Sequence, residues 1–241
     1  MTTRLLTLTL ASLTSVGAAQ AQTAYGNDFD LPPTVLTGVV ATLTGGSSIA
    51  TDPVFFGTYG NFVRSGGNTV DSGIALTLTN LPAHVAIKVS FVMVFLNSWD
   101  SRVTSNAAFS PDNLDIRIDG ALTGSYTYNN AYGNSDPDVG GNVKDIGGGT
   151  LIAEYTQFDT SYFYTDTVVD MATDLAYTFA HTASTLTINW SASGAGWQGL
   201  PDEGYGIDNL VVTLTPVPEP GTWALMAGGL WAIGRRAARR G

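Results

Sequence analysis

The feature that most constrains this chain is a strict two-residue alternation through residues 85–95. Every odd position in this run is apolar, and the even positions change from polar to apolar halfway along. Side chains of a β-strand point alternately to opposite faces. The first half therefore predicts a strand with one solvated face, and the second half predicts a strand that is covered on both faces.

Shorter runs with the same period recur along the chain, at residues 74–79, 114–118, 185–190 and 210–214. Gly, Pro and Asn residues separate them, as in turns. No comparable helical period occurs between them. Many short strands without a convincing helix predict an all-β fold, a two-sheet antiparallel sandwich of jelly-roll type. Residues 129–149 are rich in Gly, Asn and Asp and predict a long surface loop.

Charge limits the partners of this sandwich. Residues 22–216 carry 5 basic and 19 acidic side chains, a net charge of −14. Such a body repels nucleic acid and anionic lipid. The chain has no cysteine, so disulfides, thiol nucleophiles and cysteine-ligated metals are excluded.

The N-terminus is typical of a secretory signal peptide. Arg4 precedes an apolar stretch, and Ala19-Gln20-Ala21 supplies the small residues that signal peptidase requires. An amphipathic first helix is the alternative, but this segment has no charged face. We therefore predict a signal helix over residues 1–21, with Ala19 and Ala21 at the cleavage site.

The C-terminus has three parts: a proline-rich motif, an apolar stretch and a basic end. The prolines hold their segment extended, in a form that a protease can bind as a strand. Arginines that follow an apolar segment remain on the cytoplasmic side of a membrane. The motif comprises Val217, Pro218, Glu219 and Pro220, and the basic end carries Arg235, Arg236, Arg239 and Arg240.

This order resembles the PEP-CTERM sorting signal of Gram-negative bacteria that produce exopolysaccharide. The resemblance implies that a membrane-embedded exosortase cuts at the Pro-Glu-Pro motif and passes the protein outward. The apolar run at residues 221–233 has 13 residues, whereas about 20 are needed to span a bilayer. A permanent anchor remains an alternative. A nucleic-acid-binding arm is disfavoured by the acidic body.

A second resemblance covers roughly residues 35–215 and concerns the body. Its motifs lie at residues 81–84, at 97–100 with 111–114 to follow, and at 202–209. They are similar to those of the jelly-roll ectodomains that often precede such tails, which are themselves similar to lectin-like and carbohydrate-binding sandwiches.

Catalytic patterns are absent from the sequence. There is no nucleotide-binding loop and no nucleophile elbow. We interpret His84 and His181 as structural histidines. Glycoside hydrolysis needs two carboxylates across a cleft, and no constellation around Glu154 or Glu203 indicates one. We therefore predict that the protein is not an enzyme.

Calcium is the cofactor that the loops suggest. Hard cations prefer clustered carboxylate and carbonyl oxygens. Asp100, Asp112, Glu203 and Asp208 lie in or beside loops that can converge at one end of a sandwich. The alternative is that these residues cap turns.

Sugar binding requires exposed aromatic faces. Trp99, Trp197 and Tyr205 lie in the loop-proximal motifs and are candidates, although core packing is the more common role of such residues. Thr-Leu-Thr recurs at residues 42–44, 77–79, 185–187 and 213–215, which raises ice binding as an alternative. No regular spacing predicts a ladder of these threonines, so we interpret them as solvent-facing strand residues.

The sequence thus predicts a signal peptide at residues 1–21, a β-sandwich at 22–216, and a sorting tail with a hydrophobic helix at 217–241. We expect a non-enzymatic protein that signal peptidase and an exosortase deliver to the cell surface or the exopolysaccharide matrix. A calcium-assisted carbohydrate-binding module or adhesin, with exopolysaccharide as its partner, is the alternative.

Overall fold

The structure is a computed structural model that describes residues 20–46, 48–51, 60–65, 73–99, 112–128, 130, 149–156, 165–194, 197–199, 203–218 and 228–231. Residues 21–216 form one compact unit, and the segments at residues 1–20 and 217–241 belong to another. The only helix of four or more residues among the described ranges covers residues 228–231. The two predicted flanking helices fall almost entirely outside these ranges.

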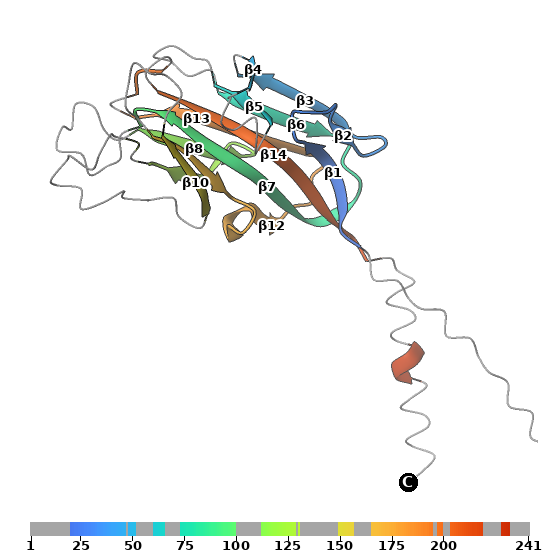
Figure 1. The fold of residues 1–241 in the computed structure, drawn as a ribbon. Coiled ribbons are helices and arrows are strands. Elements are labelled where there is room, and N and C mark those ends of the chain that lie inside the picture. Colours follow the sequence, from blue (N-terminus) through green and yellow to red (C-terminus); the bar gives the residue numbers. More distant parts are fainter. Residues whose placement is uncertain are drawn as a thin grey trace, which may run out of the picture. The chain divides into compact units, whose positions relative to one another are not determined.

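The body consists of two sheets, and all of its strand pairs are antiparallel (Figure 1). The prediction of an all-β, two-sheet antiparallel fold is confirmed, while the jelly-roll type stays a prediction. Sheet A is built around the order β10-β11-β7-β14-β1-β2. Its strands are β1 (Gln22–Asn27), β2 (Thr34–Val35), β4 (Ser48–Thr51), β5 (Asn61–Arg64), β7 (His84–Asn97), β10 (Thr150–Thr156), β11 (Thr165–Asp170), β12 (Thr178–Ala180) and β14 (Glu203–Pro216).

Sheet B has the order β3-β6-β13-β8-β9. Its strands show the alternation that the sequence predicts, because one face packs on the core and the other faces solvent. In β6 and β8, buried and half-buried side chains alternate without interruption. The strands are β3 (Val40–Gly45), β6 (Ile74–Thr79), β8 (Asn113–Ile118), β9 (Ala121–Tyr126) and β13 (Thr185–Ser193); a short 3-10 helix, η2 (Leu175–Tyr177), precedes β12.

Two 14-residue strands, β7 and β14, form the centre of sheet A and pair along almost their whole length. Val92, Val94 and Leu96 of β7 are buried although they point away from the core face, as the sequence predicts for the second half of this strand. At the other end Val85 is 40% exposed. Gly206 of β14 allows close packing on this outer face, since a Cβ there would lie 2.3 Å from the Phe62 ring.

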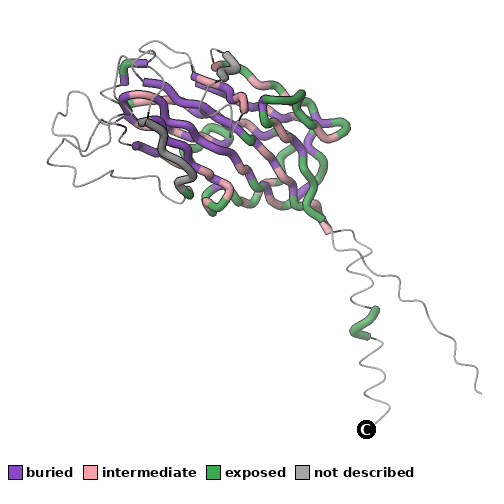
Figure 2. The backbone as a smooth tube through the Cα atoms, viewed as in Figure 1, coloured by how far each residue is buried: buried purple, intermediate pink, exposed green. Residues whose placement is uncertain are grey.

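The core lies between the two sheets, and buried residues follow the strands (Figure 2). Large aromatic side chains join the sheets: Phe91 of β7 contacts the edges of Trp190 from β13 and Tyr177 from η2. All seven residues that the strand pattern predicts as core are at most 1% exposed. They are Ile87, Val89, Phe91, Leu114, Ile116, Leu210 and Val212.

Along one edge, strand β14 pairs with β5 in its first half and with β1 in its second half. Gly206 and Ile207 pair with β5, whereas residues 210–214 pair with β1. Between them the pairing of β14 with β7 shifts register, and Asn209 takes a left-handed conformation with φ 48°. Bulges of this kind redirect side chains and often lie beside functional sites. Asp208 lies at this junction, directly before the register shift.

Candidate functional site

The first site is the end of the sandwich at which the body begins and ends. Gln22, the first residue of β1, lies opposite Leu214 of β14. Pro216, the last residue of β14, pairs with His84, the first residue of β7. Because β1 and β14 are antiparallel neighbours, both chain ends of the body leave sheet A side by side (Figure 1). We call this the exit end.

The two histidines of the chain contact each other at the exit end. His84 is buried, and its Nδ1 lies 2.7 Å from the carbonyl oxygen of Pro82. A carbonyl only accepts, so Nδ1 of His84 donates to it, and Nε2 of His84 is hydrogen-bonded to Nδ1 of His181 at 2.7 Å. Nε2 of His181 then lies 3.2 Å from a carboxylate oxygen of Asp119, which follows β8. This chain of contacts ties sheet A to sheet B, which agrees with structural roles for both histidines.

The opposite end, where β7 finishes, contains the predicted aromatic residues. Trp99 and Tyr205 are fully buried and Trp197 is 9% exposed. Trp99 Nε1 donates to the carbonyl oxygen of Gly204, and its ring centroid is 5.5 Å from that of Trp197. Tyr205 Oη donates to the carbonyl oxygen of Trp190. The predicted exposed sugar platform is therefore wrong for these residues, because core packing buries all three and internal hydrogen bonds also hold Trp99 and Tyr205.

A buried polar network supports this end, which we call the loop end. Asn130 is buried, donates to the carbonyl oxygen of Phe95 and accepts from Thr167 Oγ1 at 2.9 Å. Asp166, also buried, accepts from the backbone amide of Asn97 at 2.9 Å. Sequence reasoning missed these residues, because their contacts join segments that are 35–69 positions apart.

Three of the four predicted calcium ligands are among the described residues, and these three do not form one group. Asp112 and Glu203 are buried at the loop end, at the starts of β8 and β14, and Asp100 lies outside the described residues. Asp208 lies five positions along β14 from Glu203, about 17 Å away at roughly 3.3 Å per residue. One ion cannot bridge that distance. Glu203 instead accepts a hydrogen bond from the backbone amide of Gln198 at 2.6 Å.

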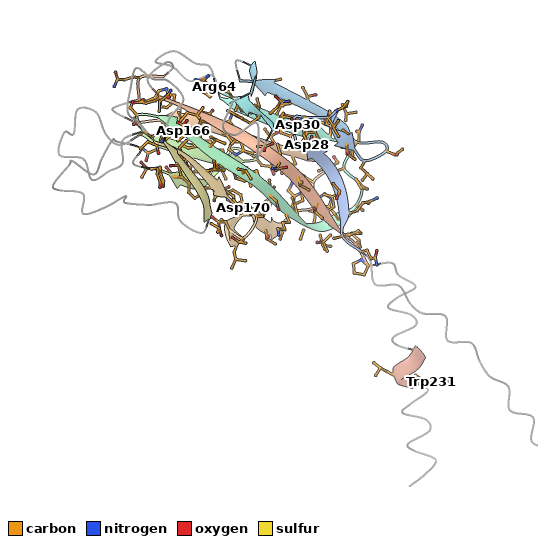
Figure 3. All side chains as sticks on the ribbon, in the orientation of Figure 1. Asp28, Asp30, Arg64, Asp166, Asp170 and Trp231 are labelled. Carbon is orange, nitrogen blue, oxygen red and sulfur yellow. The ribbon has the colours of Figure 1, made fainter. Side chains whose placement is uncertain are left out.

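Asp208 belongs to a second site, at the junction of β1, β5 and β14. Burial raises the pKa of Asp208 to about 7, and the charges of Asp30 and Asp28 add to the effect; the amide of Asn209 partly opposes it. Figure 3 shows Asp28 and Asp30 side by side in the segment after β1. We call these three carboxylates the junction acids. They were not predicted as a group, because Asp208 is about 180 positions from the other two.

Hydrogen bonds and a close backbone approach fix the position of Asp30 at this junction. Asp30 accepts from both the backbone amide and the side-chain amide of Asn61, at 2.9 and 2.8 Å. A Cβ at Gly60 would lie 2.0 Å from an Asp30 oxygen, so glycine is required for this approach. Beside it is a pocket of about 270 Å³, lined by residues such as Asn27, Leu31 and Asn209.

Within the described ranges, however, no group of three or more His, Cys, Asp or Glu side chains is arranged to hold a metal ion.

The outer face of sheet B is polar. Thr42, Thr77 and Thr187 lie opposite one another on β3, β6 and β13, and Thr79 lies opposite Thr185. The segments at 77–79 and 185–187 thus pair residue for residue, whereas the segment at 42–44 meets its neighbour only at Thr42, because Thr44 lies opposite Ala75 and Thr79 lies opposite Val40. One row of three threonines and one pair fall short of a regular ladder.

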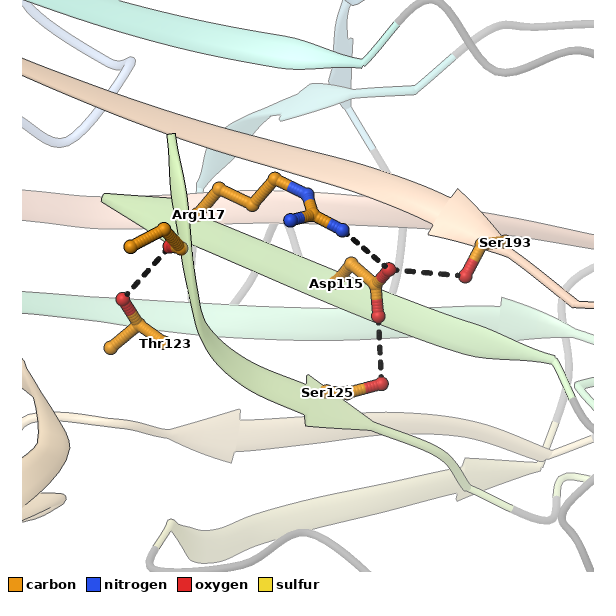
Figure 4. A network of polar contacts seen from close by, with 6 residues as sticks. Asp115, Arg117, Thr123, Ser125 and Ser193 are labelled. Atoms are coloured by element: carbon orange, nitrogen blue, oxygen red, sulfur yellow. Dashed lines mark hydrogen bonds and ion pairs between the residues drawn. The ribbon is translucent and has the colours of Figure 1, made fainter. Parts of the chain in front are cut away.

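An ion pair lies on the same face, on β8. Asp115 is 3.7 Å from the guanidinium of Arg117 and accepts from Ser125 Oγ at 2.7 Å and from Ser193 Oγ at 3.4 Å (Figure 4). Serine hydroxyls and one neighbouring arginine satisfy this carboxylate, so the arrangement is that of a solvated sheet surface.

The tail follows the exit end directly. Val217 is 46% exposed. Leu230 and Trp231 of the short helix are exposed as well (Figure 3 labels Trp231). Glu219, Pro220 and the four terminal arginines lie outside the described residues, as does Ala19. No helix in the described part of the chain is long and apolar enough to cross a membrane.

Comparison with known proteins identifies the tail. Residues 216–240 match the model of the PEP-CTERM protein-sorting motif. A comparison with curated protein sequences gave no match. Among solved structures, the chain is similar to the enzymatically active domain of tailspike protein 4 of bacteriophage CBA120, with 11% identity and a TM-score of 0.26. The similarity covers 74% of this chain but only 19% of the tailspike chain. Residues 216–240 of this chain are a PEP-CTERM protein-sorting motif, joined directly to an all-β body of two antiparallel sheets.

Proposed function

We propose that this chain is an exported, non-enzymatic protein whose β-sandwich is delivered to the cell surface or exopolysaccharide matrix by an exosortase-type membrane protease. The observation that carries the proposal is the PEP-CTERM motif, which starts at the last residue of the folded body. Val217, Pro218, Glu219 and Pro220 form the cleavage region, and the arginines at 235, 236, 239 and 240 stop transfer of the chain.

Signal peptidase removes residues 1–21 first in this scheme, after Ala21. The tail then holds the protein transiently in the membrane until the exosortase acts. A helix over residues 221–233 would be about 20 Å long at 1.5 Å per residue, against a hydrocarbon core of about 30 Å. Local thinning of the bilayer and extension of the arginine side chains to the interface make up the difference. Such a marginal anchor suits a segment that is held only briefly.

A structural or matrix role is supported by what the polar residues of the body do. The two histidines are hydrogen-bonded to each other, and His181 also lies 3.2 Å from a carboxylate oxygen of Asp119. Asp166 and Glu203 accept hydrogen bonds from backbone amides at the loop end. These are contacts that hold a fold together, and they leave the acidic body to interact with neutral polymers or other proteins.

Expression in an exopolysaccharide-producing host, with and without its exosortase, tests the proposal. We expect the protein outside the cell when the exosortase is present, and retention in the membrane when it is absent. A variant with Pro218→Ala and Pro220→Ala should be retained in both hosts. The matched control, Pro32→Ala with Pro33→Ala, changes two prolines of the body and should be released like the wild type. Equal release from both hosts would contradict the proposal.

A second candidate function is binding of a divalent cation such as calcium by an extracellular module. The observation behind it is that the charges of Asp30 and Asp28 add to burial in raising the pKa of Asp208, so a cation drawn to these acids would relieve their repulsion, although the described side chains are not arranged as a ready-made metal site. Thermal melts at pH 8 in EDTA and in calcium test this candidate. Calcium should raise the Tm of the wild type and leave that of Asp208→Asn unchanged. An equal response of the two proteins would exclude the junction as the site.

A further inference from the structure

We infer that the last residues of β14 must separate from β1 and β7 before the sorting tail can be cleaved, so that local unfolding of the exit end controls release. The inference rests on the proposed function, since it concerns how the same protease reaches its site. It adds that the folded body itself restricts that access.

The distance between the fold and the cleavage motif is short. Only Val217 separates Pro216, the last strand residue, from Pro218, the first proline of the motif. An extended chain spans at most about 3.6 Å per residue, so Pro218 lies within about 7 Å of the strand end. Proteases bind several residues on each side of the cleaved bond as an extended strand. The residues that precede the motif in such a complex are therefore those of β14.

Those residues already have strand partners: Leu214 is paired on both edges, whereas Thr215 and Pro216 are paired with β7. Leu214 lies opposite Gln22 of β1 and opposite Ile87 of β7. Thr215 lies opposite Ala86. Leu214 is 1% exposed and belongs to the core. A strand that is paired on both edges cannot also pair with a protease, so binding requires these pairs to open.

The end of β14 is built so that a short opening is feasible. The pairing shifts register between Thr215 and Pro216, and proline has no amide hydrogen to donate. Strand ends of this kind open locally at a cost far below that of global unfolding. The first core contact to be lost is that of Leu214, which limits how far the opening extends.

The partner strand is fixed more firmly than β14. His84, opposite Pro216, is buried and bonded to Pro82 and His181. Nε2 of His181 lies in turn 3.2 Å from a carboxylate oxygen of Asp119, which follows β8 of the other sheet. Separation at this end therefore means that β14 leaves β7, because β7 is held from both sheets.

A disulfide in this cysteine-free chain tests the inference. The full chain with Ala86→Cys and Thr215→Cys places two cysteines directly opposite each other, a geometry close to that of a disulfide. The substrate is reconstituted with the exosortase in proteoliposomes, and cleavage is followed by intact mass. The matched control carries Thr77→Cys and Thr187→Cys, an opposed pair in sheet B. Intact mass shows that each disulfide forms, and the Tm shows that each protein is folded. If the first exit-end pair does not form a disulfide, Lys88→Cys with Thr213→Cys replaces it, since these two residues are also opposite each other.

We expect the oxidised exit-end disulfide to slow cleavage at least about tenfold, reduction to restore it, and the control disulfide to have no effect. An eight-residue Gly-Ser insertion after Pro216 should restore cleavage of the oxidised protein, because the protease then binds the spacer. Cleavage of the oxidised exit-end variant at the wild-type rate would overturn the inference and leave the proposed function standing. A wild-type chain that is not cleaved at all would overturn the proposed function.

Discussion

The two ends of the paired strands β7 and β14 are built differently. At the exit end, one face of β7 is solvated, the alternation is broken where His84 is buried and Val85 is 40% exposed, and the polar contacts include the histidine pair, the carbonyl oxygen of Pro82 and a carboxylate oxygen of Asp119. At the loop end both faces of β7 are buried, and aromatic rings and amide networks pack together. We therefore expect the loop end to contribute more to stability than the exit end, where we propose that the protease acts.

The largest expected effect comes from breaking the loop end. Trp99→Ala removes a fully buried ring that packs on Phe95 and Trp197. We expect a loss of about 3–5 kcal/mol in the free energy of unfolding, measured by chemical denaturation. Leu122→Ala, at a site 53% exposed, is the control and should change little. Unchanged stability of Trp99→Ala with weaker retention on exopolysaccharide would restore the sugar-platform interpretation.

The junction between the two ends responds to pH. Burial and the neighbouring acids raise the pKa of Asp208 from 3.8 to about 7. The native state then keeps a proton that the unfolded state has lost, so stability falls as pH rises from about 4 to 7 and stays low above. Asp208→Asn should be more stable than wild type by about 2–4 kcal/mol at pH 8, and equal to it below pH 4.

Denaturation in EDTA at several pH values measures this difference. An equal pH slope in both proteins would show that Asp208 ionises normally.

Removing one histidine of the His84–His181 pair tests how much this contact stabilises the exit end. His181→Ala removes the partner of buried His84 and the contact with Asp119. We expect a loss of about 1–3 kcal/mol, because a buried polar nitrogen is left without its hydrogen bond. Hydrogen exchange should show the increase in opening concentrated near residues 84–88 and 212–216. Increased exchange spread evenly over both ends would contradict the division between them.

The sequence predicted most of the strand framework because alternation is a local signal. Residues 74–79, 114–118 and 185–190 pair in one sheet as their period indicates. It did not predict β1 as a strand, nor that β1 and β5 share one edge of β14. Such pairing depends on contacts between distant segments, which no local pattern records.

The site residues differ in the same way: those that are contiguous in the sequence were predicted, and those that come from distant segments were not. The sorting motif is contiguous, and it was predicted from its order of parts. The calcium ligands were grouped by loop membership, whereas the acids whose charges act on the pKa of Asp208 are Asp28 and Asp30. The aromatic residues were ambiguous because a tryptophan beside a loop has the same sequence whether it is buried or exposed.

The smallest effect is expected on the outer face of sheet B. Asp115→Ala removes the contacts with Arg117, Ser125 and Ser193 on a partly exposed surface. Surface ion pairs contribute little, so we expect a loss of about 1 kcal/mol or less. The same denaturation experiment measures it. A loss as large as that of Trp99→Ala would mean that this face carries stability that we assign to the loop end.

The central claim, that the chain is exported and cut at both ends of its sandwich, is tested most directly by the intact mass of the protein recovered outside the producing cell. The account predicts a protein that begins at Gln22 and lacks all residues beyond the region of Val217–Pro220. Extracellular protein that still carries Arg239 and Arg240 would contradict it.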